Sequence, residues 1–200
     1  MIVIGVTGGV GAGKSTVLNY LKDNYRAYVL KADSLAQTLY EKGEVCYRPI
    51  VDLFGKDILG ADQSIDRRKM AERMFNNESM TKAVNDIVHP AVRIRIEEII
   101  AEQRNMKKYD FFFLEAALLI ECGYKPILDE LWFVYAKPSV RRVRLSQSRG
   151  YSSEKIESIM NSQLSTREFK KASDFVIDNS YSEQETYDQI KEHMEMFKEG

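Results

Sequence analysis

The feature that most constrains the fold is an apolar, mostly β-branched run that leads directly into a glycine-rich segment. Residues 2–7 read Ile-Val-Ile-Gly-Val-Thr, a pattern typical of a strand buried on both faces of a sheet. Residues 8–15 read Gly-Gly-Val-Gly-Ala-Gly-Lys-Ser and match G-x-x-x-x-G-K-[ST] at every fixed position. Residues 15–23 are predicted to be helical, so the motif has the strand–loop–helix context of a P-loop. The sequence therefore predicts an α/β P-loop NTPase fold.

Each residue type in this loop has a physical reason. Glycines let the backbone turn tightly and bring N–H groups against phosphate oxygens, and the helix N-terminus adds partial positive charge. Lys14 is expected to reach the β- and γ-phosphates of ATP, and the Ser15 hydroxyl to bind Mg²⁺. The alternative is a glycine-rich turn with an exposed lysine. The predicted ATP-binding residues are Gly8, Gly9, Gly11, Ala12, Gly13, Lys14, Ser15 and Thr16.

Four more short apolar runs complete a predicted five-stranded parallel sheet flanked by helices. They cover residues 27–30, 111–114, 131–135 and 175–177. The interval between the second and third runs is too long for one crossover, and most of it has helical character. We therefore expect a P-loop core from residues 1–34 and 108–200, with a helical insert at 35–107. Helices are predicted at residues 34–41, 47–54, 67–75, 79–104 and 182–198.

The longest predicted helix, 79–104, shows one apolar face. Val92, Ile96, Ile99 and Ile100 recur at helical spacing. Pro90 is expected to kink or start this helix.

Two acidic residues follow predicted strands at the edge where α/β proteins bind ligands. Glu115 ends the third strand and is expected to hold Mg²⁺ or its waters; a solvent-facing acid is the alternative. Asp33 follows the second strand and is a candidate general base for a substrate hydroxyl. Its alternative is the N-cap of a helix that begins at Ser34. His89 is a candidate substrate contact, with a structural histidine as the alternative, and His193 is expected at the surface.

Residues 137–153 contain five basic side chains and no acidic one. They are Lys137, Arg141, Arg142, Arg144 and Arg149. In small P-loop kinases such a stretch forms a lid that closes over the phosphates and excludes water. If it is helical, Arg141 and Arg144 share one face, and Arg142 and Arg149 share another. A solvated helix face or a weak polyanion patch is the alternative.

Composition excludes several other classes. The chain has 200 residues, 44% hydrophobic and 30% charged, and a net charge of −1, which fits a globular protein without global attraction to nucleic acid or membrane. Cys46 and Cys122 lack disulfide or metal-site patterning, and no signal peptide or membrane-spanning run is evident, so a cytoplasmic location is expected. The N-K-x-D of GTPases is absent, and Asp57–Gly60 spells D-x-x-G by chance.

Taken together, these motifs resemble those of the dephospho-CoA kinase family over nearly the whole chain. The similar segments are Thr7–Thr16, Ala32–Ala36, Phe54–Leu59, His89-Pro90 with Arg93, Leu118–Glu121, a lid with Arg144, Arg149 and Gln163, and Asp174–Asn179. The sequence departs from the family pattern at four positions. Ala12 stands for Ser, Lys31 for Asp, Glu115 for Asp and Ala117 for Pro.

The resemblance implies ATP-dependent phosphorylation of the 3′-hydroxyl of dephospho-CoA, with a P-loop core, a helical CoA-binding insert and a lid at about 138–168. It implies Asp33 as the base, with Lys14, Arg144 and Arg149 also catalytic. Substrate contacts would be Thr7, Asp33, His89, Arg93, Leu118 and Glu121, and Asn179 would lie on the adenine side. The implied cofactors are ATP and Mg²⁺, and the expected state is a monomer or small homo-oligomer that binds neither nucleic acid nor membrane.

Two alternatives stay open at this point. The first is another small P-loop kinase that acts on a nucleotide, nucleoside or sugar, although the long insert is larger than such acceptors need. The second is a nucleotide-dependent switch or a nucleic-acid-binding ATPase that uses the basic stretch, although the net charge and the missing N-K-x-D count against it.

Overall fold

The computed structural model describes residues 1–75 and 77–198 and divides the chain into two compact units. The first unit comprises Met1–Leu30 and Met106–Gly200, and the second comprises Lys31–Asn105. The boundaries lie four and two residues before those expected from the sequence, so Asp33 belongs to the second unit. Residues 76, 199 and 200, which fall within the predicted regions, lie outside the described part of the chain.

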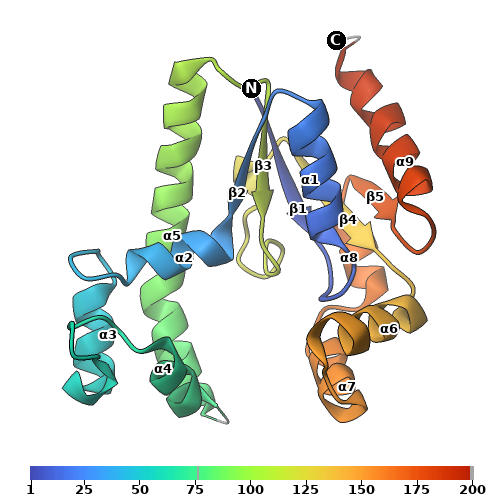
Figure 1. Ribbon diagram of the computed structural model, residues 1–200. Coiled ribbons are helices and arrows are strands. Elements are labelled where there is room, and N and C mark those ends of the chain that lie inside the picture. Colours follow the sequence, from blue (N-terminus) through green and yellow to red (C-terminus); the bar gives the residue numbers. More distant parts are fainter. Residues whose placement is uncertain (76, 199–200) are drawn as a thin grey trace. The chain divides into compact units, whose positions relative to one another are not determined.

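The first unit is built on a five-stranded sheet with strand order β2-β3-β1-β4-β5 (Figure 1). The strands are β1 (Ile2–Thr7), β2 (Ala27–Lys31), β3 (Phe111–Glu115), β4 (Glu130–Tyr135) and β5 (Phe175–Asp178). β1 pairs in parallel with both β3 and β4, and β4 pairs in parallel with β5. All five predicted strands and the parallel α/β class are confirmed. Parallel strands place their carboxyl ends at one edge, so β1, β3, β4 and β5 all deliver the residues that follow them to that edge.

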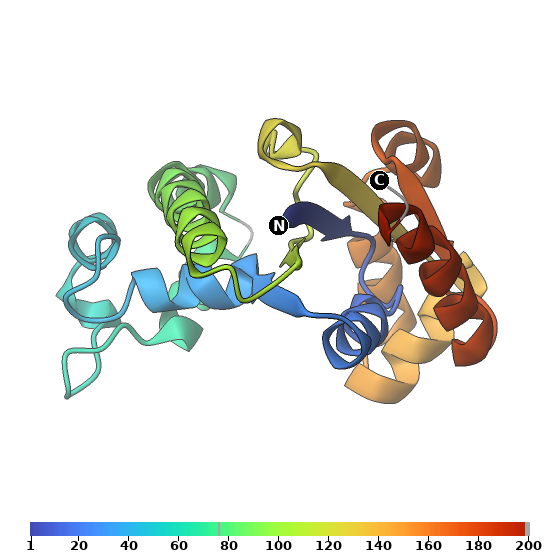
Figure 2. The same cartoon turned by 90° about the horizontal axis from the view of Figure 1, so that it is seen from above.

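The helices of this unit connect the strands or follow the last of them. They are α1 (Lys14–Asn24), η2 (Lys125–Ile127), α6 (Pro138–Arg149), α7 (Ser153–Asn161), α8 (Thr166–Ala172), α9 (Glu183–Glu195) and η3 (Met196–Lys198). α1 and α9 lie side by side on one face (Figure 2), where Tyr20 stacks on Tyr187 with ring centroids 4.1 Å apart. Leu21 of α1 and Ile190 of α9 are fully buried in one cluster with Trp132. Each such side chain contributes about 1.5–3 kcal/mol by leaving water.

The second unit is helical, as predicted. It contains α2 (Ala32–Leu39), α3 (Tyr47–Phe54), η1 (Lys56–Ile58), α4 (Arg67–Met74) and α5 (Glu78–Met106), whose last residue belongs to the first unit. α5 continues through Pro90, so the expectation that Pro90 starts the helix is wrong. The ring removes one backbone donor, but Val88 and Val92 on either side are buried and hold the helix together.

His193 and Asp57 each have a structural partner. His193 is not a surface residue: its side chain is only 14% exposed, bonds Glu130 Oε2 at 2.8 Å and stacks on Phe175. Asp57 of the D-x-x-G sequence lies in η1, is exposed and pairs with Arg73. This is a structural role, as expected if the match to the GTPase motif is a coincidence. Within the described residues, no helix is both long and apolar enough to cross a membrane.

Candidate active site

The glycine-rich loop joins β1 to α1 at the carboxyl edge of the sheet. Gly8, Gly11 and Gly13 have φ values of 149°, 81° and 93°, which lie in the region that favours glycine. α1 begins at Lys14 with Gly13 as N-cap and no capping side-chain bond. No side chain therefore caps the first turn of α1, and such an N-terminus suits phosphate oxygens.

Lys14 meets a carboxylate at this edge. Its Nζ donates to the Gly8 carbonyl at 2.9 Å and lies 3.8 Å from Glu115 Oε1. The two side chains are only 13% and 19% exposed. The register of β1 and β3 places Glu115 opposite Val6, beside the start of the loop. The solvent-facing alternative for Glu115 is therefore wrong, and a cation and a carboxylate lie together beside the glycine-rich loop.

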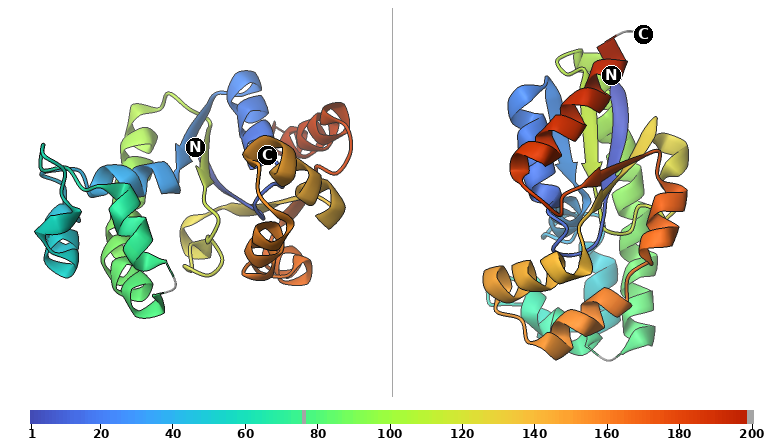
Figure 3. Two further views of the ribbon diagram at one scale, coloured as in Figure 1. Left: turned by 60° about the horizontal axis from the view of Figure 1, so that its bottom comes forward. Right: turned by 90° about the vertical axis from the view of Figure 1, so that its right-hand side faces the viewer.

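Two arginines of α6 reach the backbone of the loop. Arg141 Nε donates to the Val10 carbonyl at 2.9 Å, and Arg144 Nη1 donates to the Ala12 carbonyl at 3.3 Å. α6 and α7 lie at the carboxyl end of the strands, next to the loop (Figure 3). The expectation that Arg141 and Arg144 share a face is confirmed, and that face is turned to the loop.

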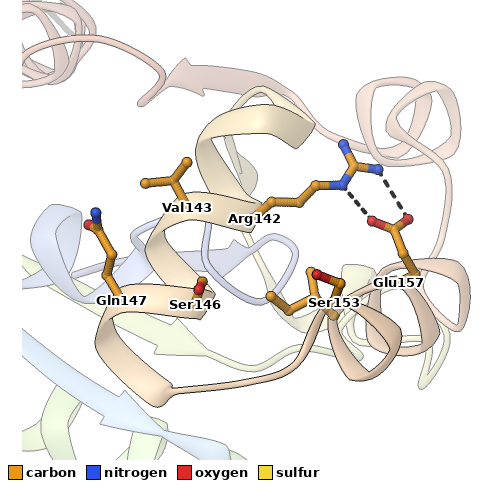
Figure 4. A pocket seen from close by; sticks show the side chains of 7 residues that line it. Arg142, Val143, Ser146, Gln147, Ser153 and Glu157 are labelled. Carbon is orange, nitrogen blue, oxygen red and sulfur yellow. Dashed lines mark hydrogen bonds and ion pairs between the residues drawn. The ribbon is translucent and has the colours of Figure 1, made fainter.

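The other two α6 arginines have different surroundings. Arg142 pairs with Glu157 of α7 through two hydrogen bonds of 2.5 and 3.1 Å (Figure 4). Arg149 is exposed, with its guanidinium carbon 5.9 Å from the centroid of the Tyr151 ring. Sequence reasoning did not select Arg141 as a site residue. The signal that could have found it is its spacing from Arg144, which places both side chains on one face of the helix.

Asn179 follows β5 and is buried against the loop. Its Nδ2 donates to the Ala12 carbonyl at 2.7 Å, and its Oδ1 accepts from the Thr186 hydroxyl at 3.0 Å. A Cβ on Gly13 would overlap the Asn179 amide. The side chain thus fastens the loop to β5 and α9, and its adenine contact stays a prediction.

Replacing Asn179 with alanine is expected to lower the free energy of unfolding by about 1–3 kcal/mol, because the buried Thr186 hydroxyl and the Ala12 carbonyl lose a partner. Asp at this position keeps the acceptor for Thr186 but loses the donor to Ala12, so it should destabilise as well. Urea unfolding of both variants measures this. A stability equal to that of the parent, with weaker ATP binding only, would contradict the structural role.

The remaining candidates of the first unit lie near the same edge. Thr7 is fully buried, and its hydroxyl donates to the Ala117 carbonyl at 3.3 Å, so it ties β1 to the segment after β3. Leu118 is 46% exposed, and Glu121 is exposed in the same segment. Leu118 and Glu121 are therefore accessible to a ligand. The buried Thr7 hydroxyl is used instead to join β1 to the segment after β3.

In the second unit, Asp33 is the second residue of α2 and is exposed. Lys31 is the N-cap and is extended, so the helix begins two residues before the predicted start and the N-cap alternative for Asp33 is wrong. An acid in the first turn still interacts favourably with the helix dipole.

His89 and Arg93 lie one turn apart on α5. Arg93 Nε donates to Glu97 at 3.0 Å. His89 lines an open hollow of about 570 Å³ together with residues of α4 and α5, which lie beside each other in Figures 1 and 3. Its lining also includes Met74, Asn77, Glu78, Thr81, Lys82, Asn85 and Asp86.

Known proteins resemble this chain over almost its whole length. The family model described as dephospho-CoA kinase matches residues 2–185. The dephospho-CoA kinase of Aquifex aeolicus is 40% identical over 188 residues, covering 94% of this chain and 93% of the relative. That of Carboxydothermus hydrogenoformans is 35% identical over 188 residues, covering 94% and 90%.

Solved structures also resemble this chain over most of its length. A Thermus thermophilus protein superposes with a TM-score of 0.81 at 29% identity, covering 98% of this chain and 97% of that one. The dephospho-CoA kinase of Campylobacter jejuni superposes with a TM-score of 0.69 at 27% identity, covering 95% and 96%. Shikimate kinase from Acinetobacter baumannii, at 10% identity and a TM-score of 0.54, shares the fold over 100% of this chain and 94% of its own. The chain therefore belongs to the dephospho-CoA kinase family.

Proposed function

We propose that this protein transfers the γ-phosphoryl group of ATP to the 3′-hydroxyl of dephospho-CoA, giving CoA and ADP. Family membership makes the chain a phosphotransferase that uses ATP. The observation that carries the proposal is the complete glycine-rich loop, with Lys14 and Glu115 at its base, in a chain that matches the family from residue 2 to residue 185. Other P-loop kinases share the loop, so the match over the whole chain supports the acceptor.

The loop and Lys14 supply most of the expected rate enhancement. Backbone N–H groups and the α1 N-terminus bind the phosphates, and Lys14 neutralises charge that develops on the transferred group. Arg144 and Arg149 add charge from the lid, which also excludes water when it closes. These are electrostatic and positioning effects, as phosphoryl transfer requires.

Ser15 and Glu115 have the chemistry that a Mg²⁺ site needs. Mg²⁺ prefers hard oxygen ligands and is usually held by one or two protein groups together with phosphates and waters. Ser15 follows Lys14 in the chain, and Glu115 Oε1 lies 3.8 Å from the Lys14 ammonium. No cluster of three or more His, Cys, Asp or Glu suited to a metal occurs among the described residues. When bound, Mg²⁺ neutralises charge on the phosphate oxygens.

Asp33 is proposed as the general base that accepts the proton of the attacking hydroxyl. His89, Arg93, Leu118 and Glu121 are proposed to hold the acceptor. The exposure of Asp33 supports its role, because a base must be accessible to substrate. We further propose a cytoplasmic monomer or small homo-oligomer; Cys46 and Cys122 are thiols, which is compatible with a reducing compartment.

A coupled ADP-release assay with several acceptors tests the proposal. Dephospho-CoA should support rapid ADP formation with Mg²⁺ and ATP, whereas adenosine, AMP, gluconate and pantothenate should not. The CoA product is identified by mass. Turnover with another acceptor and none with dephospho-CoA would replace the proposed substrate.

The lid arginines are expected to affect kcat more than acceptor binding. Arg144→Ala and Arg149→Ala should each lower kcat by roughly 10- to 100-fold, the value of one charge-assisted hydrogen bond. Lysine should rescue poorly because it lacks the planar fork of guanidinium. Steady-state kinetics with both substrates varied measures this. If both alanine variants keep the parental kcat, neither side chain acts on the transferred phosphoryl group.

A further inference from the structure

The peptide backbone at Val10 is held from both sides by the lid. The Val10 N–H donates to Gln163 Oε1 at 3.3 Å, and the Val10 carbonyl accepts from Arg141 Nε at 2.9 Å. Arg141 Nη2 also donates to Gln163 Oε1, at 2.5 Å. These bonds close a ring, here called the Val10 bracket, that joins the glycine-rich loop, α6 and the turn after α7.

The bracket fixes the direction of a neighbouring N–H group. In a planar trans peptide, the carbonyl of one residue and the N–H of the next point in opposite directions. Holding the Val10 carbonyl therefore turns the Gly11 N–H away from Arg141. Arg144 and Asn179 hold the Ala12 carbonyl in the same way, which directs the Gly13 N–H.

The directed N–H groups remain available to a ligand. Among the described residues, neither the Gly11 nor the Gly13 N–H donates a hydrogen bond to a protein acceptor. They belong to alternate residues, because the Ala12 N–H between them donates to the Gly9 carbonyl at 3.1 Å. Backbone N–H groups left without a protein acceptor in such a loop can bind an anion. Gly11 has a φ of 81°, which glycine adopts without strain. Because glycine can adopt many other conformations as well, hydrogen bonds to the preceding peptide restrict its backbone.

The charge on Arg141 supports a functional reason for the bracket. Arg141 is half-buried, and its hydrogen-bond partners are neutral oxygens. No carboxylate of the described residues lies within ion-pair distance of it, whereas Arg142 pairs with Glu157. Burial lowers the pKa of the Arg141 guanidinium, and the Arg142 charge adds to this effect. Burying an unpaired cation is costly, so a purely structural contact would be better made by a neutral side chain.

We propose that Arg141 and Gln163 are positioning residues for nucleotide binding: the Val10 bracket holds the Val10–Gly11 peptide so that the Gly11 N–H faces the phosphates. The inference rests on the proposed function only through its use of ATP and is independent of the acceptor. It also links the lid to the loop, because movement of α6 away from the loop must open the bracket.

Calorimetric titration with ADP and Mg²⁺ tests the bracket in the full chain. Arg141→Met and Gln163→Met should each raise the Kd for ADP by roughly 10- to 100-fold. The double variant should bind about as weakly as the weaker single variant, because both substitutions remove one unit. Arg141→Lys should not restore binding, since lysine cannot bond Val10 and Gln163 in the same fixed fork. Arg142→Met is the matched control from the same helix and should keep the parental Kd.

Steady-state kinetics distinguish positioning from damage to the fold. KM for ATP should rise in both single variants, with little change in KM for dephospho-CoA, in kcat at saturating ATP or in Tm without nucleotide. A weakened Arg141→Met beside an unchanged Gln163→Met would mean that the guanidinium acts on the nucleotide directly, and it would overturn the bracket. Losses of ADP affinity that add up in the double variant would also overturn the bracket. If Arg141→Met does not fold, the Kd of Gln163→Met decides the matter. ADP binding needs no acceptor, so the result stands even if dephospho-CoA proves not to be the substrate.

Discussion

Replacing Lys14 with alanine is expected to lower the rate of phosphoryl transfer by about 10³-fold or more. The ammonium stands at the base of the glycine-rich loop, bonded to the Gly8 carbonyl and 3.8 Å from Glu115. From this position it can offset charge on the transferred phosphoryl group, where little water competes. The loss should appear in kcat as well as in kcat/KM, because the interaction strengthens in the transition state.

The Lys14 variant should remain folded. Lys14 opens α1, and the buried residues of that helix, Val17, Leu18 and Leu21, are untouched. Lys22→Ala is the matched control: it removes an exposed lysine from the last turn of the same helix and should leave turnover unchanged. Circular dichroism and Tm measure folding, and single-turnover kinetics measure the chemical step. Near-normal turnover in a folded Lys14→Ala protein would disprove the phosphate-binding role of this loop.

The strands and the loop were predictable because their determinants are local. The β-branched run at 2–7 and the glycine spacing of 8–15 each specify backbone conformation without help from distant residues. The helical insert was predictable for a similar reason, since the apolar face of α5 repeats at helical spacing.

The contacts that finish the site were not predictable, because they join residues far apart in the sequence. Arg141 reaches Val10 across 131 positions, and Asn179 reaches Ala12 across 167. The sequence alone predicts His193 at the surface, because its partner Glu130 lies 63 positions away, on a strand, and is not visible in the local pattern. No periodicity in one sequence encodes such pairs. They depend on how helices that follow β4 and β5 pack against the loop.

Asp33 is a different case, because its role as general base stays a prediction and only the N-cap alternative is wrong. The sequence allows Asp33 to be a general base, the N-cap of a helix, or both, and only the N-cap role depends on where α2 begins. Helix ends are uncertain by one or two residues even in structures. The extended Lys31 takes the N-cap position, so Asp33 falls inside the first turn and its carboxylate is not needed for capping.

Asp33→Asn is therefore expected to separate catalysis from stability. Proton transfer to a positioned base contributes typically ~10²–10⁴-fold, so kcat should fall by about two orders of magnitude or more. The stability cost should be at most about 1 kcal/mol, the value of an acid near a helix N-terminus. Asp33→Ala should behave like Asn in both respects, because no capping bond is lost. The Kd for ADP should not change.

The measurement combines kcat, Tm and ADP affinity for both variants with one control. Asp52→Asn removes an exposed carboxylate from α3 of the same unit and should be silent in all three. A fall in kcat with unchanged Tm and ADP affinity would place Asp33 at the reacting hydroxyl. A fully active Asn variant would remove it from the chemistry. Phosphate positioning by the loop, Lys14 and the lid would then be the main source of rate, which is chemically sufficient because the attacking oxygen can lose its proton late in a loose transition state.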